Sequence, residues 1–151
     1  MKKNSYPRLH LILLGLIISA CANTQSALPT QSQDCQPPSE WKIQFALSGG
    51  IAGQSRSLSI SSNGSVIVQD LRKEEKQEST ISQDELKKIA GMLVQACPFK
   101  SIRTDNRCAD CFEYMLNVTM NGRQYSFEAN EISIPENLSP LLGYLGSFLT
   151  K

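Results

Sequence analysis

Histidine is almost absent from this chain of 151 residues, and its single copy, His10, lies in a segment that we expect to be removed. The rest of the chain therefore has no imidazole for a general base, a Ser-His or Cys-His pair, or a histidine-liganded zinc. The sequence also has no apolar run of the ~20 residues that a membrane-spanning helix needs. We expect a non-enzymatic protein that holds no metal and no cofactor.

The first twenty residues have the features of an export signal. Three basic residues come first, residues 9–18 form a short and largely apolar stretch, and small residues stand directly before Cys21. Signals of this composition are cleaved after export. A cysteine directly after the small residues is typical of a bacterial lipoprotein signal. We therefore predict a signal peptide at residues 1–20 and lipidation at Cys21.

Lipidation would attach the protein to a membrane without any segment spanning it. Several acyl chains hold far more firmly than a single chain, which binds only marginally. Ala22, rather than an Asp, follows the predicted lipidated cysteine and favours the outer membrane over the inner one where both exist. Residues 21–39 are rich in Ser, Thr, Gln and Pro, as in a tether. The expected location is the cell envelope, on its extracytoplasmic side.

The chain also lacks an excess of positive charge once the signal peptide is removed. The 15 Lys and Arg residues fall to 12 when Lys2, Lys3 and Arg8 leave with the signal, against 14 Asp and Glu. Nucleic-acid binding requires a basic face. We therefore expect no nucleic-acid partner.

Alternation of apolar and polar residues predicts several half-buried strands in the domain at residues 40–151. Two of the intervening segments contain Asn-Gly, which favours tight hairpin turns. The charged residues 72–78 predict a solvated edge or a loop. The expected strands lie around residues 41–47, 58–60, 66–68, 112–120 and 125–129.

Two helices complete the predicted domain. Ser82 and Glu85 form a capping-box pattern before apolar residues at helical spacing, which predicts a helix at 83–96. Ser139 followed by Pro140 predicts the cap and first residue of a second helix. The predicted fold class is α+β, with a small antiparallel β-sheet of about five strands packed against two α-helices.

Four cysteines remain after Cys21, and an exported protein is expected to form disulfides. The favoured pairing joins Cys108 to Cys111 and Cys35 to Cys97. Crossed pairings fit the spacing equally well. A redox role is disfavoured, because Cys108 and Cys111 precede a predicted strand rather than opening a helix, and an acid lies between them. A zinc site would need a second closely spaced pair.

One loop between two predicted strands is rich in glycine. Glycine permits unusual backbone angles and close approach of another chain, so a wide hairpin or bulge explains the composition. A phosphate loop is disfavoured, because no helix and no Lys-Ser/Thr pair follows. An apolar side chain raised on such a loop also suits insertion into a pocket. The candidate inhibitory loop comprises Ser48, Gly49, Gly50, Ile51, Ala52 and Gly53.

The order of these motifs resembles the emfourin family, protein inhibitors of protealysin and related thermolysin-like metalloproteases. The likeness covers about residues 41–149: SGGIAG after the first strand, a helix ending near Pro98, the hairpin FEYMLNVTMNGRQYSFEAN and the tail IPENLSPLLGYLGSFL. The resemblance implies a small inhibitor domain that blocks the cleft of a secreted metalloprotease. The lipid anchor and the four cysteines depart from the cytoplasmic members of that family.

Two functions follow from these features. The leading hypothesis is a membrane-anchored lipoprotein that inhibits or binds a secreted thermolysin-like metalloprotease. The alternative is a non-enzymatic envelope binding or assembly protein without inhibitory activity. The sequence makes no prediction of the oligomeric state.

Overall fold

The computed structural model describes residues 35–36, 38–99, 102–103 and 108–150. The predicted signal peptide, the predicted lipidation residue Cys21 and the tether up to residue 34 lie outside these residues. In the described part of the chain, no helix is both long enough and apolar enough to cross a membrane.

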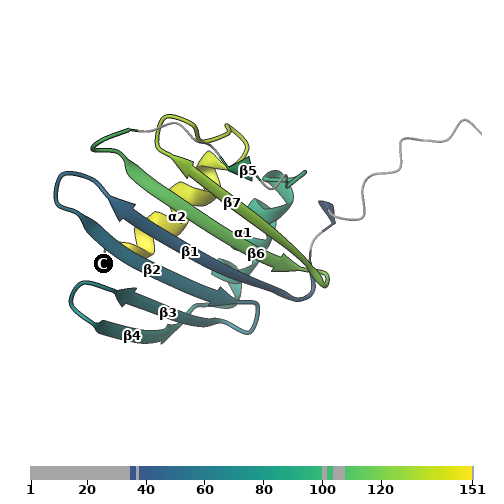
Figure 1. The fold of residues 1–151 in the computed structure, drawn as a ribbon. Coiled ribbons are helices and arrows are strands. Elements are labelled where there is room, and N and C mark those ends of the chain that lie inside the picture. Colours follow the sequence, from purple (N-terminus) through teal and green to yellow (C-terminus); the bar gives the residue numbers. More distant parts are fainter. Residues whose placement is uncertain (1–34, 37, 100–101, 104–107, 151) are drawn as a thin grey trace, which may run out of the picture.

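A single twisted sheet and two helices make up the domain (Figure 1). The strand order is β4-β3-β2-β1-β6-β7-β5, and every neighbouring pair is antiparallel except β5 with β7. The elements are β1 (Trp41–Gly49), β2 (Gln54–Ser61), β3 (Ser65–Asp70), β4 (Glu75–Thr80), α1 (Gln83–Gln95), β5 (Ile102–Arg103), β6 (Phe112–Met120), β7 (Arg123–Asn130) and α2 (Ser139–Leu149).

Both helices cover the same face of the sheet, and the other face is open (Figure 1). Strand β1 lies at the centre, where Phe45 is opposite Leu58 on one side and Leu116 on the other. These side chains point toward the helices and are buried, because successive residues of a strand face opposite sides. Other fully buried core residues are Ile43, Ile60, Val66, Val118, Ile89, Leu93, Leu141 and Leu145. The predicted α+β class and one-sided packing are confirmed.

Local signals in the sequence correctly located α1 and the second hairpin. Ser82 caps α1, and the reciprocal hydrogen bonds with Glu85 complete the capping box. Asn121 and Gly122 connect β6 to β7 with positive φ angles of 50° and 75°, as the tight turn requires.

The strand count of about five was too low, because the sheet contains six antiparallel strands and the two-residue β5. The charged segment 72–78 was predicted as an edge or loop, and its second half belongs to the edge strand β4. All six residues of β4 are exposed, so no apolar alternation marks it. Charged side chains are a common protection of edge strands against unwanted pairing.

Ser139 was wrongly predicted as the cap of the last helix. It is the first residue of α2, whose N-cap is Leu138, and no side chain caps the helix there. The backbone N–H groups of Leu138 and Ser139 donate to the carbonyl of Pro135, so the preceding turn leads directly into the helix. At the other end of α2, the Arg56 guanidinium donates to the carbonyl of Leu149. This cation satisfies a helix C-terminal carbonyl.

Candidate functional site

The glycine-rich loop forms the tip of the β1–β2 hairpin, at the end of the sheet where β1 finishes. Gly49 and Gln54 form the last strand pair, and Gly53 N–H closes the turn by donating to Gly50 O at 2.9 Å. Ile51 stands at the tip with 95% of its surface exposed. The loop thus presents a large apolar side chain almost fully to solvent.

Two of the glycines are required by the approach of β6. A Cβ atom on Gly49 would lie 2.5 Å from the carbonyl oxygen of Cys111, and one on Gly50 would lie 2.7 Å from the Phe112 ring. Both glycines also have positive φ, 93° and 67°. Of the two interpretations of the glycines, the hairpin holds, because the strand register continues without a bulge to Gly49 and Gln54. The close approach of β6 adds a reason that the sequence did not reveal.

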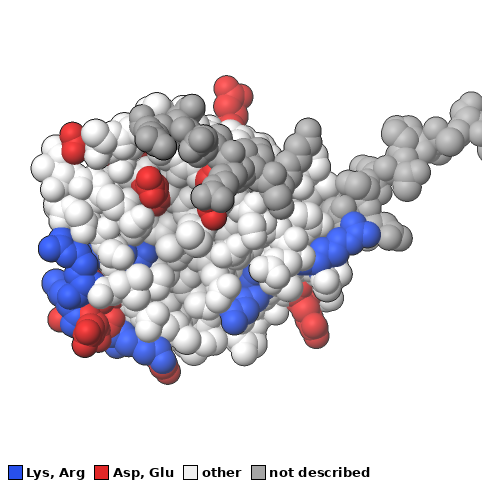
Figure 2. Space-filling model, in the orientation of Figure 1, with Lys and Arg blue, Asp and Glu red and all other residues white. Residues whose placement is uncertain are grey.

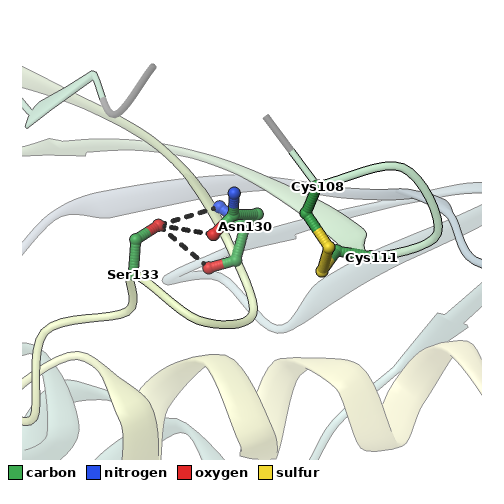
Figure 3. The surroundings of a disulfide bond; sticks show 4 residues. All are labelled: Cys108, Cys111, Asn130 and Ser133. Carbon is green, nitrogen blue, oxygen red and sulfur yellow. Dashed lines mark hydrogen bonds between the residues drawn. A yellow bond between two sulfur atoms is a disulfide. The ribbon is translucent and has the colours of Figure 1, made fainter. Parts of the chain in front are cut away.

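A disulfide supports the loop from the β6 side. Cys108 and Cys111 are bonded, with their Cα atoms 5.4 Å apart, and Cys111 is buried (Figure 3). The carbonyl of Cys111 accepts a hydrogen bond from Gly50 N–H at 3.2 Å. The disulfide predicted between Cys108 and Cys111 is confirmed, and it directly adjoins the base of the candidate loop.

A turn after β7 lies beside this disulfide (Figure 3). The Ser133 hydroxyl accepts from Asn130 N–H at 3.1 Å and donates to the side-chain carbonyl oxygen of Asn130 at 2.8 Å. Asn130 is buried, so these bonds stabilise the turn against the cost of an uncompensated polar group. The turn presents Ile132, whose surface is 70% exposed.

Arg72 supports the loop from the β3 side. Its guanidinium donates to the carbonyls of Ala52 and Gly53, at 2.6 Å and 3.0 Å. The Asp70 carboxylate accepts from the backbone N–H groups of Arg72 and Lys73 and so shapes the β3–β4 turn. The sequence did not predict this role for Arg72, because a basic residue in a charged segment carries no signal of a distant carbonyl partner.

Opposing effects act on the pKa of the Asp70 carboxyl. Desolvation raises the pKa, but the hydrogen bonds from Arg72 and Lys73 N–H and the charges of Lys73 and Arg56 together outweigh it. The pKa of Asp70 consequently lies below its ordinary value of 3.8. The carboxylate form stabilises the turn that holds Arg72 in place.

The other predicted pair, Cys35 and Cys97, lies away from this loop, and both side chains are half-buried. Their pairing stays a prediction. Because Cys108 is bonded to Cys111, the crossed pairings of either residue with Cys35 or Cys97 are excluded. The Cys108–Cys111 disulfide is followed directly by β6 and not by a helix.

The open face of the sheet offers a second surface. It carries a shallow hollow of about 280 Å³, lined by uncharged residues that include Ala46, Ser57, Ser59, Met115 and Asn117. Figure 2 shows few charges over the middle of this face and most of them toward its edges. The hollow contains no group of three or more potential metal ligands among the described residues.

Comparison with known proteins adds no identification. No protein-family model matches the sequence, and no curated protein matches it either. The emfourin resemblance accordingly stays a hypothesis carried by the motifs themselves.

Proposed function

We propose that the protein is a lipid-anchored lipoprotein of the bacterial envelope whose domain inhibits a secreted thermolysin-like metalloprotease. In this proposal the loop Gly49–Gly53 enters the protease cleft and places Ile51 in an apolar pocket. The observation that carries the proposal is the almost complete exposure of Ile51 on a loop held from both sides. The order of the motifs, which resembles the emfourin family, supplies the class of partner.

The support of the loop favours tight binding. A loop that is already ordered loses little conformational entropy when it binds, so more of the contact free energy appears as affinity. Burying one Ile side chain is worth about 1.5–3 kcal/mol. Hydrogen bonds from Arg72 to the loop and from the loop to Cys111 supply this order before any partner arrives.

Loop geometry also bears on resistance to cleavage. Gly49, Gly50 and Gly53 all have positive φ, between 56° and 93°. Residues in this region of backbone space depart from an extended strand. A protease that aligns its substrate as an extended strand would therefore align this loop poorly for hydrolysis.

The position of the loop agrees with a membrane tether. The predicted tether joins the domain at the start of β1, whereas the loop follows the end of β1. The first and last of the nine strand residues are eight steps of about 3.4 Å apart, so the two ends lie roughly 27 Å from each other. A lipid at Cys21 would leave the loop directed away from the tether attachment and available to exported proteases.

The direct test is an inhibition titration with residues 22–151, prepared with disulfides formed, against several thermolysin-like enzymes. We expect inhibition by the wild-type chain, a loss of at least about a hundredfold for Ile51→Asp, which places a charge in an apolar pocket, and no change for Met115→Asp. Met115 is a matched control, because it is also an exposed apolar residue but lies on the open face. Absence of inhibition at micromolar concentration with every enzyme would contradict the proposal.

The uncharged hollow of the open face favours a second candidate function, binding of another envelope component without inhibition. Affinity capture from the native envelope separates the two functions. A partner lost with Ala46→Arg but retained with Ile51→Asp would favour the open face and the assembly role. The opposite pattern, with a protease as the captured partner, would favour inhibition.

A further inference from the structure

Large apolar side chains that are exposed are few in the described residues, and most of them gather at one end of the sheet. Ile51, Ile132 and Leu71 are 95%, 70% and 54% exposed, and the fourth such residue, Met115, is 47% exposed on the open face. The first three lie in the β1–β2 loop, in the turn after β7 and in the β3–β4 turn. Exposed apolar groups that cluster mark interaction sites more often than scattered ones do.

Hydrogen bonds join the Leu71 turn to the Ile51 loop. Leu71 N–H donates to Ser55 O at 2.9 Å, which fixes the start of the turn against β2. The next residue, Arg72, donates to the carbonyls of Ala52 and Gly53 in the loop. The two apolar side chains are therefore presented by segments that contact each other directly.

A second set of hydrogen bonds joins the Ile51 loop to the Ile132 turn through the start of β6. Gly50 N–H donates to Cys111 O at 3.2 Å, and Glu131 N–H donates to Phe112 O at 3.2 Å. Cys111 and Phe112 are neighbours in the chain, so the two bonds act on the same short segment. Three turns that are distant in sequence thus form one continuous rim along this end of the sheet.

Strand order gives the spacing of the rim. The β3–β4 turn and the β1–β2 loop are two strand positions apart, and β7 lies about two and a half positions beyond the loop. With neighbouring strands ~4.8 Å apart, the steps are about 10 Å and about 12 Å. The row is therefore roughly 22 Å long, which is the length of six or seven residues of extended peptide at ~3.3 Å each.

We propose that Leu71, Ile51 and Ile132 together occupy three apolar pockets along one linear, peptide-binding cleft. The inference rests on the proposed function and extends it, because a single inserted loop needs one pocket whereas this row needs an extended cleft. Ile51 stands in the middle of the row and is the most exposed of the three residues, so it enters deepest. The two flanking residues determine how the domain aligns along the cleft and which proteases it binds.

The test measures inhibition constants of alanine variants against a thermolysin-like endopeptidase that the wild-type chain inhibits. We expect Leu71→Ala and Ile132→Ala each to weaken inhibition about tenfold, and Ile51→Ala about thirtyfold or more, according to the apolar groups removed from contact. Met115→Ala is the control and should leave the constant unchanged. All four side chains are exposed, so thermal unfolding should confirm that the variants keep their fold.

A double variant adds a readout that a purely structural role would not produce. Separate pockets predict that Leu71→Ala and Ile132→Ala are additive and together weaken inhibition about a hundredfold. If both single variants behave like Met115→Ala while Ile51→Ala still weakens inhibition, the three-pocket row is overturned and the proposed function stands. If the wild-type chain inhibits none of the enzymes, the proposed function fails and the row fails with it.

Discussion

At the end of the sheet where β1 begins, two hairpin connections are short and polar. Asn121 and Gly122 join β6 to β7, and a turn around Asn63 joins β2 to β3. Backbone hydrogen bonds hold these connections to the start of β1, from Ser62 N–H to Trp41 O and from Asn121 N–H to Glu40 O. Such turns reverse the chain and display no large apolar side chain.

The opposite end is built from the same strands but has a different surface. Three of the connections at this end carry Ile51, Leu71 and Ile132, all exposed, and a disulfide adjoins the central loop. Exposure of three large apolar residues costs solubility and contributes nothing to folding. In the proposed function, one end of the domain serves the fold, whereas the other end contacts the protease.

The largest expected effect concerns a disulfide outside the loop-bearing end. We predict that Cys35 and Cys97 form the second disulfide, which would close a long loop and stabilise the domain by about 4 kcal/mol. Cys35→Ser combined with Cys97→Ser should lower the free energy of unfolding by about that amount in urea titrations. Alkylation of both thiols in the native protein without reductant would show that the bond does not form.

Next in size is a glycine comparison between the two ends. Gly49→Ala should destabilise the domain by about 3 kcal/mol, because it combines a positive φ with a clash against Cys111 O. Gly122→Ala should cost about 1 kcal/mol, since its φ is also positive but no atom lies within 4 Å of the added Cβ. Urea unfolding measures both values. Equal losses would mean that the close approach of β6 to the loop contributes nothing.

A smaller effect is expected from the disulfide at the loop-bearing end. Cys108→Ser with Cys111→Ser opens a loop of only a few residues, which should cost about 2 kcal/mol in the chain-entropy account. The variant should remain folded but inhibit the protease less, because Cys111 O accepts from Gly50 N–H. Unfolding in urea measures the loss of stability, and an inhibition titration measures the change in the inhibition constant. Inhibition equal to that of the wild type would show that the disulfide does not help to order the loop.

The smallest expected effect depends on pH and on Asp70. Because the folded-state pKa of this carboxyl lies below its ordinary value of 3.8, its contribution to stability is present above that value. The contribution is lost as the pH falls through the lower, folded-state pKa. Asp70→Asn should therefore flatten the acid side of the stability profile and leave its slope near neutral pH unchanged. Chemical unfolding between pH 2 and about 7 provides the measurement, and identical slopes for both proteins would contradict the assignment.

Local patterns predicted the central strands, both Asn-Gly connections and α1, because alternation and capping depend only on near neighbours in the sequence. They left edge and loop undecided for β4, whose exposed edge position needs no apolar face. They failed for Ser139, whose helix starts from a preceding turn. The candidate loop was found from its glycines. Its supports were not, because Arg72 and Cys111 reach it only through the pairing of distant strands.

Two apolar residues of the rim were also missed. Leu71 follows β3, a strand with the apolar run Val66, Ile67 and Val68, and Ile132 follows the end of β7, so each could equally have been a core residue. An apolar residue at the end of a strand can be either buried or exposed, and only the folded structure distinguishes the two cases. The row of three is thus a property of the strand order and cannot be found by a motif.

Amide hydrogen exchange in the complex with an inhibited protease tests the central claim most directly. Peptides that cover residues 49–53, 71–72 and 131–132 should gain protection, whereas those covering the turns at 62–64 and 121–122 should exchange as they do in the free protein. Protection at the two polar turns or around Met115, with residues 49–53 unchanged, would contradict the account.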